Sequence, residues 1–220
     1  MRKAGIAEEC SSPWSANVVV VAKRDKAGNP VASWITIDYR GLNSIIVGDK
    51  FPLPNAQDCL RSLNNCKYLS VIDLSNSYFQ VAIRPNDGWI TAFRTIRGQF
   101  CHTRLGQGCK NSPAVFCRLM SLVLRGLACT LAYIDDTITF SPSFEAHLVD
   151  LQKVLDRFKK ADLKLKPTKC KFFQQRVKFV GHYVSANGVE VNDAKLACIV
   201  NWSFSRSISE LRSFLGTCSY

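Results

Sequence analysis

The chain has 220 residues, of which 47% are hydrophobic and 21% are charged. This composition excludes a peptide-sized module and a disordered, highly charged chain. Lys and Arg number 29 against 17 Asp and Glu, which gives a formal net charge of +12. A polyanion is therefore the natural partner, and nucleic acid and an anionic membrane surface remain the alternatives from charge alone.

Cysteine usage and the N-terminus favour an intracellular protein. The ten cysteines are scattered, and the CxxC spacing typical of zinc sites does not occur. Buried, reduced thiols are the expected state. Residues 1–9 lack the apolar core of a signal peptide, and no apolar run approaches the ~20 residues that cross a bilayer. The sequence predicts a soluble intracellular chain with no membrane partner.

Hydrophobic periodicity and turn residues predict a mixed α and β chain. Two β-branched runs flank a turn of Asp, Gly, Asn and Pro, which predicts a hairpin over residues 18–37. The further expected elements are a helix at 56–63, a strand at 68–74, a strand pair at 89–95 and 99–103, a helix at 113–127, a hairpin at 130–140, a helix at 143–161, short strands at 163–165, 177–184 and 189–191, and helices near 193–202 and 207–218.

Two adjacent acids stand at the turn of the expected 130–140 hairpin. Asp135 and Asp136 repel each other there, and neither suits a β-strand. Enzymes of phosphoryl transfer hold two divalent ions with carboxylates at strand ends, and Asp73 ends another expected strand. The alternative is that all three acids are ordinary turn and capping residues, and spacing alone does not decide between these readings.

The strings around the acids resemble the reverse transcriptases of gypsy-type LTR retrotransposons. Tyr133 to Asp136 is similar to the Tyr-x-Asp-Asp box of that family. The other similar strings, in family order, are SPWS at 12–15, IDYRGLN at 37–43, DLSNSYFQ at 73–80, LGQGCKNSPA at 105–114, KCKF at 169–172, FVGH at 179–182 and ELRSFLG at 210–216. The resemblance therefore covers nearly the whole chain.

The resemblance implies an RNA- and DNA-directed DNA polymerase that adds deoxynucleotides to a primer. Asp73, Asp135 and Asp136 would be the catalytic residues and the ligands of two Mg²⁺ ions, with Mn²⁺ as a substitute. The metals would lower the pKa of the primer 3′-hydroxyl and neutralise charge at the phosphorus, while the protein positions the reactants.

The same resemblance implies further site residues. Tyr78 matches an aromatic residue under the incoming sugar, where its ring would exclude a ribose 2′-hydroxyl. Lys23, Leu74 and Gln107 match other nucleotide-binding positions. The nucleic-acid contacts implied near the primer end are Tyr133, Phe179, Gly181 and His182. For Lys23 and Tyr78 the alternatives are a solvated surface lysine and a core aromatic residue.

The implied fold is an α+β right-handed palm with fingers, in which a small antiparallel sheet is backed by helices. Residues 1–67 would form the fingers and the start of the palm, residues 68–188 the palm with a fingers segment at 89–115, and residues 189–220 the start of a truncated thumb. The implied partners are a template with its primer, deoxynucleoside triphosphates, and the protease, RNase H and integrase regions of one polyprotein. The implied location is a cytoplasmic particle, with the nucleus as the alternative.

The chain departs from the family pattern at three positions. Trp34 stands where a triphosphate-binding Arg or Lys is usual, Gly106 where Pro is usual, and Cys109 where a larger residue is usual. These departures, with the end at Tyr220, favour an alternative in which the chain is a truncated, impaired remnant that only binds nucleic acid. The three retained acids favour the polymerase.

Overall fold

The computed structural model describes the whole chain except residues 25–28, 64–65, 192 and 220. In chain order the elements are η1 (Arg2–Ala4), β1 (Ala7–Glu9), β2 (Ala16–Arg24), β3 (Pro30–Asp38), α1 (Arg40–Ile45), α2 (Ala56–Arg61), β4 (Tyr68–Asp73), η2 (Ser77–Gln80), η3 (Pro85–Thr91), β5 (Phe93–Thr95), β6 (Gly98–His102), α3 (Ser112–Val123), β7 (Thr130–Tyr133), β8 (Asp136–Ser141), α4 (Phe144–Lys160), η4 (Pro167–Lys169), β9 (Lys171–Gln174), β10 (Arg176–Phe179), β11 (His182–Ser185), β12 (Gly188–Val191), α5 (Asp193–Val200) and α6 (Ile208–Ser219).

A five-stranded sheet forms one lobe of the molecule, in the order β1-β6-β5-β2-β3. The antiparallel β2–β3 pair is its longest hairpin, and β5 and β6 join this sheet from a segment more than fifty residues away in sequence. Buried Ile37, Tyr39, Leu42 and Phe93 form the core of this lobe. The hydroxyl of Tyr39, the residue after β3, donates to the carbonyl of Thr91 at the end of η3 and lies 2.9 Å from Nδ1 of His102 at the end of β6.

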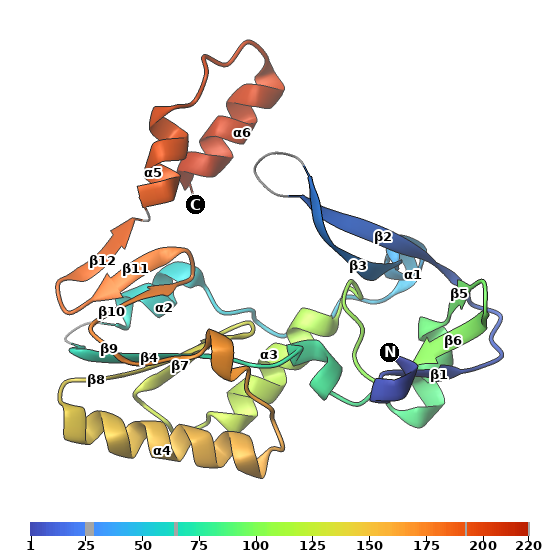
Figure 1. Cartoon of the computed structure of the whole chain (residues 1–220), viewed down its shortest axis with the longest axis horizontal. Helices are drawn as coiled ribbons and strands as arrows, with labels where there is room; N and C mark the ends of the chain where they lie inside the picture. Colours follow the sequence, from blue (N-terminus) through green and yellow to red (C-terminus); the bar gives the residue numbers. More distant parts are fainter. Residues whose placement is uncertain (25–28, 64–65, 192, 220) are drawn as a thin grey trace.

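A four-stranded sheet in the order β7-β8-β4-β9 forms the second lobe, and it is covered on both faces. Figure 1 shows α4 along one face and β10–β12 on the other. Alternate residues of β4 face opposite ways, so Leu69 joins the cluster with α2 and β10–β11, while Ile72 joins the cluster with α3 and α4. Burial on both faces fixes the register of β4, because a slip of one residue would exchange the two faces.

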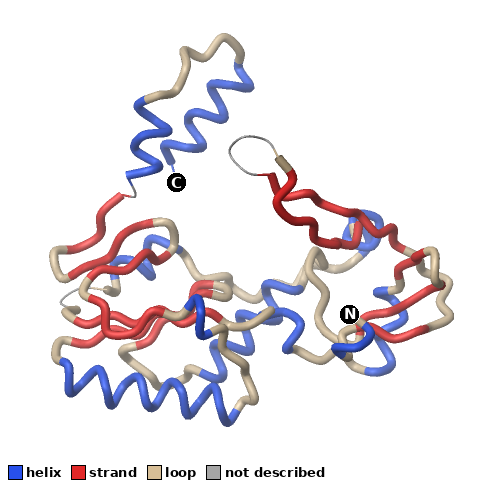
Figure 2. Tube along the Cα trace, in the orientation of Figure 1, coloured by secondary structure: helices blue, strands red, loops and turns tan. Residues whose placement is uncertain are grey.

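The remaining strands and helices follow the four-stranded sheet in sequence. Strands β10, β11 and β12 form an antiparallel meander, and α5 and α6 pack against each other beyond it (Figure 2). Trp202 and Phe214 make an edge-to-face contact between these two helices, with ring centroids 5.6 Å apart. No helix among the described residues is long and apolar enough to cross a membrane.

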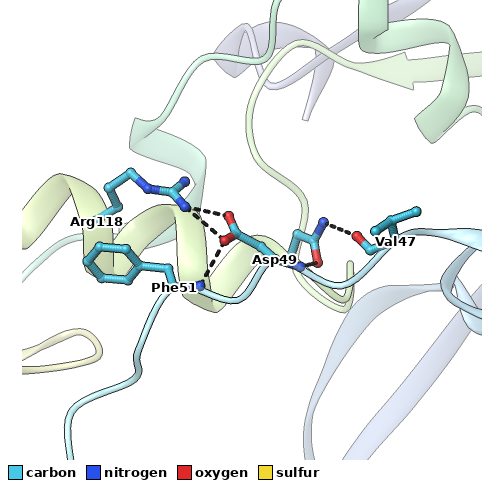
Figure 3. Close-up of polar contacts among 5 residues, drawn as sticks. Val47, Asp49, Phe51 and Arg118 are labelled. Atoms are coloured by element: carbon cyan, nitrogen blue, oxygen red, sulfur yellow. Dashed lines mark hydrogen bonds and ion pairs between the residues drawn. The ribbon is translucent and has the colours of Figure 1, made fainter.

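The segment between the two lobes is fastened to α3 by polar contacts (Figure 3). One guanidinium nitrogen of Arg118 lies 2.8 Å from each carboxylate oxygen of Asp49, and the guanidinium lies 4.9 Å from the ring centroid of Phe51. Asn111 accepts from the Asp49 amide and donates to the carbonyl of Val47. Asn111, the N-cap of α3, and Arg118 within this helix therefore position residues 47–51, which lead into the second lobe.

Most expected elements are confirmed, and three expected strands differ from the structure. The strand expected at 89–95 is wrong over its first part, where η3 continues to Thr91 and only Phe93–Thr95 is extended. The strand expected at 163–165 is reduced to one bridge between Leu165 and Leu74. The strand expected at 177–184 is interrupted by positive φ angles at Val180 and Gly181, which separate β10 from β11.

Candidate active site

The ends of β4 and β8 bring two of the three acids together. Asp73 is the last residue of β4, and the antiparallel register places it directly opposite Asp136, the first residue of β8. Directly opposed residues of antiparallel strands have Cβ atoms about 4.5–5.5 Å apart and side chains on one face. The two carboxyl groups therefore share one face at one end of the sheet.

The turn between β7 and β8 places the third acid beside them. Tyr133 pairs with Asp136, so Ile134 and Asp135 form a two-residue turn. Ile134 has a φ of 55°, which is unusual for a β-branched residue and marks local strain. Asp135 is exposed at the tip of this turn, and Asp136 is half-buried.

A lysine meets this acidic cluster from another segment. The ammonium Nζ of Lys169 lies 3.0 Å from Oδ2 of Asp73, at the end of η4. Lys169 belongs to the KCKF string at 169–172, and the sequence did not predict its place at the site. Its link to Asp73 spans 96 residues of sequence, so periodicity could not reveal it.

The electrostatics of the site show that the carboxyl groups interact. Burial raises the pKa of the Asp136 carboxyl, and the negative charges of Asp135 and Asp73 raise it further, while Lys169 lowers it. The hydrogen bond and charge of Asp73 raise the pKa of the Lys169 ammonium. A site that gathers negative charge in this way favours a bound cation.

The donor set fits Mg²⁺ in chemistry. Asp73, Asp135 and Asp136 lie at one end of the sheet, and carboxylate oxygens are the ligands that this hard cation prefers. Within the part of the chain that the structure describes, no three His, Cys, Asp or Glu side chains are gathered into a ready-made metal cage. At Asp73, the cation in contact is instead the ammonium of Lys169.

Tyr78 lies near the acids, on the short helix η2 that follows β4. Its ring makes an edge-to-face contact with Phe116, with centroids 5.5 Å apart, and it is half-buried. Burial raises the pKa of the Tyr78 phenol, and the charge of Asp135 raises it further. The side chain of Leu74 is only 3% exposed and lies in the core with α3 and α4, so a nucleotide could meet only the backbone of this residue.

The segment 105–114 runs into the first turn of α3, which begins at Ser112. Gln107 is exposed on it, and Asn43 of α1 holds the segment by donating to the Gly108 carbonyl and accepting from the Lys110 amide. A Cβ atom at Gly106 would meet its neighbours at 3.5 Å or more, which is ordinary contact. Glycine is therefore not required at this departure from the family pattern.

The other residues expected to contact nucleotide or nucleic acid differ in how far they are exposed. The side chains of Lys23 and Trp34 lie outside the described part of the chain. Tyr133 is half-buried on the strand that leads into the acidic turn, and His182 is half-buried with Nδ1 2.9 Å from the carbonyl of Val180. Phe179 is 2% exposed and belongs to the core, so its side chain packs inside the protein.

The fold and the acidic strand end are those of a polymerase of the reverse transcriptase class. The profile of the family described as reverse transcriptase (RNA-dependent DNA polymerase) matches residues 21–184, and the chain belongs to this family. The solved structure of a foamy viral protease-reverse transcriptase in complex with double-stranded DNA is 28% identical, with a TM-score of 0.90 over 99% of this chain and 38% of that chain. The expected palm-and-fingers fold is confirmed.

Curated relatives are polyproteins of transposons. The Pol polyprotein from transposon 297 of Drosophila melanogaster is 35% identical over the full chain, and that from transposon gypsy of the same organism is 31% identical over 99% of it. This chain spans about a fifth of the length of these relatives, 21% in each case. A foamy viral protease-reverse transcriptase in complex with an RNA/DNA hybrid matches with a TM-score of 0.85 at 28% identity, over 98% of this chain and 28% of that one.

Proposed function

We propose that this chain is the nucleotide-adding part of a retrotransposon Pol polyprotein, which copies RNA and DNA templates into DNA. The observation that carries the proposal is the placement of Asp73 opposite Asp136, with Asp135 at the adjoining turn, in a chain of the reverse transcriptase family. Asp135 lies at a turn that is strained by the positive φ of Ile134, and this turn leads directly into Asp136.

Asp73, Asp135 and Asp136 would hold the divalent cations, Mg²⁺ or Mn²⁺. When bound, these ions would lower the pKa of the primer 3′-hydroxyl and neutralise negative charge at the α-phosphate. The chain itself positions the reactants: the half-buried ring of Tyr78 forms the floor under the sugar and excludes a 2′-hydroxyl, and exposed Gln107 faces the nucleotide. Lys23 supplies a cation for the triphosphate in this proposal.

The proposed division into subdomains follows the sheets. Residues 1–67 contribute fingers and the start of the palm, residues 68–188 the palm with a fingers segment at 89–115, and residues 189–220 the start of the thumb. Tyr133, Gly181 and His182 would contact the primer end. Protease, RNase H and integrase regions are the proposed neighbours in the polyprotein, because the curated relatives are Pol polyproteins, and a cytoplasmic particle is the proposed location.

Primer extension tests the proposal directly. The chain is incubated with an oligo(dT) primer on poly(rA), with thymidine triphosphate and Mg²⁺, and a longer version that continues past Tyr220 is tested in parallel. Extension by either version supports the polymerase. Failure of both, with retained binding of the primer–template, selects the alternative of a binding-only remnant.

A further inference from the structure

A short ladder of backbone hydrogen bonds continues beyond the end of β4 on the side away from β8. The amide of Lys166 donates to the carbonyl of Asp73 at 2.8 Å, and the amide of Ser75 donates to the carbonyl of Lys164 at 2.9 Å. Leu74 and Leu165 form the bridge between these two bonds. The segment 164–166 therefore lies directly beside the residues that follow the first acid.

The side chain of Gln80 continues this ladder beyond Ser75 and Lys164. Its Nε2 donates to the carbonyls of Ser75, at 2.6 Å, and Lys164, at 3.0 Å. Its Oε1 accepts from the amide of Lys164 at 2.6 Å. The amide group thus joins both backbones, in the way that a further residue of a strand would.

Two side chains of the candidate site, Tyr78 and Lys169, lie close in sequence to the groups that Gln80 joins. Tyr78 lies two residues before Gln80 on the same short helix η2. Lys169 follows Lys164 through a turn in which the Lys169 amide donates to the carbonyl of Lys166 at 2.9 Å. That turn places the Lys169 ammonium 3.0 Å from the Asp73 carboxylate.

We infer that Gln80 is a positioning residue, which fixes the 164–169 segment so that Lys169 occupies the Asp73 carboxylate until a divalent cation displaces it. This inference rests on the proposed function, since it takes Asp73 as a metal ligand. The ammonium of Lys169 and the metal compete for the same oxygen atoms. Gln80 therefore sets the apparent metal affinity of the site, although it touches neither the metal nor the substrate.

The geometry requires an amide at this position. A glutamate would still accept from the Lys164 amide, but its second oxygen would face the carbonyls of Ser75 and Lys164 without a proton to donate. A methionine would preserve the length of the side chain and lose all three hydrogen bonds. Both substitutions release the 164–169 segment at one end and weaken the ion pair of Lys169 with Asp73.

Titration with Mn²⁺ in the absence of nucleic acid tests the inference on the whole chain. For Gln80→Met we expect the Kd for Mn²⁺ to fall by about two- to fivefold, because a partly exposed ion pair contributes little more than this factor. Lys169→Met removes the ion pair and should lower the Kd at least as much, and the double variant should equal Lys169→Met alone. The matched control is Gln152→Met on α4, whose Nε2 donates to Asp156, and its Kd should not change.

A second readout follows the lysine itself. The rate of Lys169 acetylation by an N-hydroxysuccinimide ester, measured by mass spectrometry against Lys159 in the same sample, should rise severalfold in Gln80→Met and stay constant in Gln152→Met. If Gln80→Met does not fold, Gln80→Glu carries both predictions. Unchanged Mn²⁺ affinity and unchanged acetylation in a folded Gln80 variant overturn the inference.

The two readouts separate this inference from the proposed function. If the unmodified chain binds Mn²⁺ and Asp135→Asn abolishes that binding, the metal site stands, and the Gln80 variants decide the inference. If the unmodified chain and Lys169→Met both fail to bind Mn²⁺, the metal site of the proposed function fails, and competition at Asp73 fails with it. The acetylation rates then still decide whether Gln80 positions Lys169.

Discussion

Asp73 and Asp136 stand directly opposite each other at the ends of β4 and β8, the two central strands of the four-stranded sheet. Along β4, the face that carries Leu69 packs in the core, and the same face carries Asp73 at the strand end. The alternation of side chains along β4 therefore places Asp73 on the same face of the sheet as Asp136. The buried register holds the pair in place although the two charges repel.

Asp136→Asn should stabilise the metal-free protein at neutral pH. The pKa of the Asp136 carboxyl is raised in the folded state, so its ionisation opposes folding once the pH exceeds its ordinary value of 3.8. Removal of the charge relieves this cost, and each kcal/mol gained should raise the Tm by roughly 2–4 °C in a chain of this size. Thermal unfolding in EDTA measures the change.

The same comparison near pH 3 provides the control. There Asp136 is protonated in both folded and unfolded chains, and the advantage of Asp136→Asn should disappear. A variant that is less stable than the unmodified chain at neutral pH would show that Asp136 has a structural role instead of forming part of a strained cation site.

Tyr78→Ala should increase incorporation of ribonucleotides relative to deoxynucleotides, on the order of tenfold. The half-buried ring packs on Phe116, and its loss opens space where a 2′-hydroxyl would lie. Tyr78→Phe keeps the ring and should keep the discrimination. Single-nucleotide incorporation of UTP and thymidine triphosphate gives the ratio of kcat/KM values, and an unchanged ratio in Tyr78→Ala would contradict this role.

Acid should destabilise the fold through two buried histidines. Burial lowers the pKa of His102 from 6.5 to about 4, and burial also lowers the pKa of His147. A histidine with a lowered pKa in the folded state stabilises the fold above the pKa of the unfolded chain, near 6.5. This stability is lost as the pH falls toward the pKa of the folded state. For His102 the free energy of unfolding lost in this way is roughly 3 kcal/mol. Urea unfolding between pH 7.5 and pH 4.5 measures this loss.

His147→Gln tests how much of the stability lost in acid comes from His147. Its Nε2 and Nδ1 lie 2.7 and 3.1 Å from the hydroxyls of Ser70 and Ser141, and Ser141 donates to Asp150. An uncharged amide should flatten the decline of stability below pH 6.5, even if it lowers stability at every pH. An equally steep decline in His147→Gln would assign the acid sensitivity to other groups.

The sequence predicted the elements that carry strong local patterns. The β-branched runs around a polar turn are confirmed as β2 and β3, and the apolar stripes with a helical period are confirmed as α3 and α4. The chain order of the motifs identified the family, which the family profile confirms. Asp73, Asp135 and Asp136 were predicted as catalytic residues from the family motifs around them, because their positions at strand ends and at a turn also fit ordinary turn and capping residues.

Relations between distant segments could not be predicted in this way. The ion pair of Lys169 with Asp73 and that of Arg118 with Asp49 depend on contacts across 96 and 69 residues. The short strand β9 has an exposed lysine and phenylalanine at its start and lacks alternation, so its pairing with β4 has no local signal. The side chain of Gln80 replaces a backbone partner, which no periodicity reveals.

Single-nucleotide incorporation by Asp135→Asn tests the central claim most directly. Asp135 is exposed at its turn, so the amide should leave the Tm and the affinity for primer–template close to those of the unmodified chain. We predict that the unmodified chain extends an oligo(dT) primer on poly(rA) with Mg²⁺, and that Asp135→Asn loses at least about a thousandfold in rate. A folded Asp135→Asn variant that extends the primer at an undiminished rate would contradict the account.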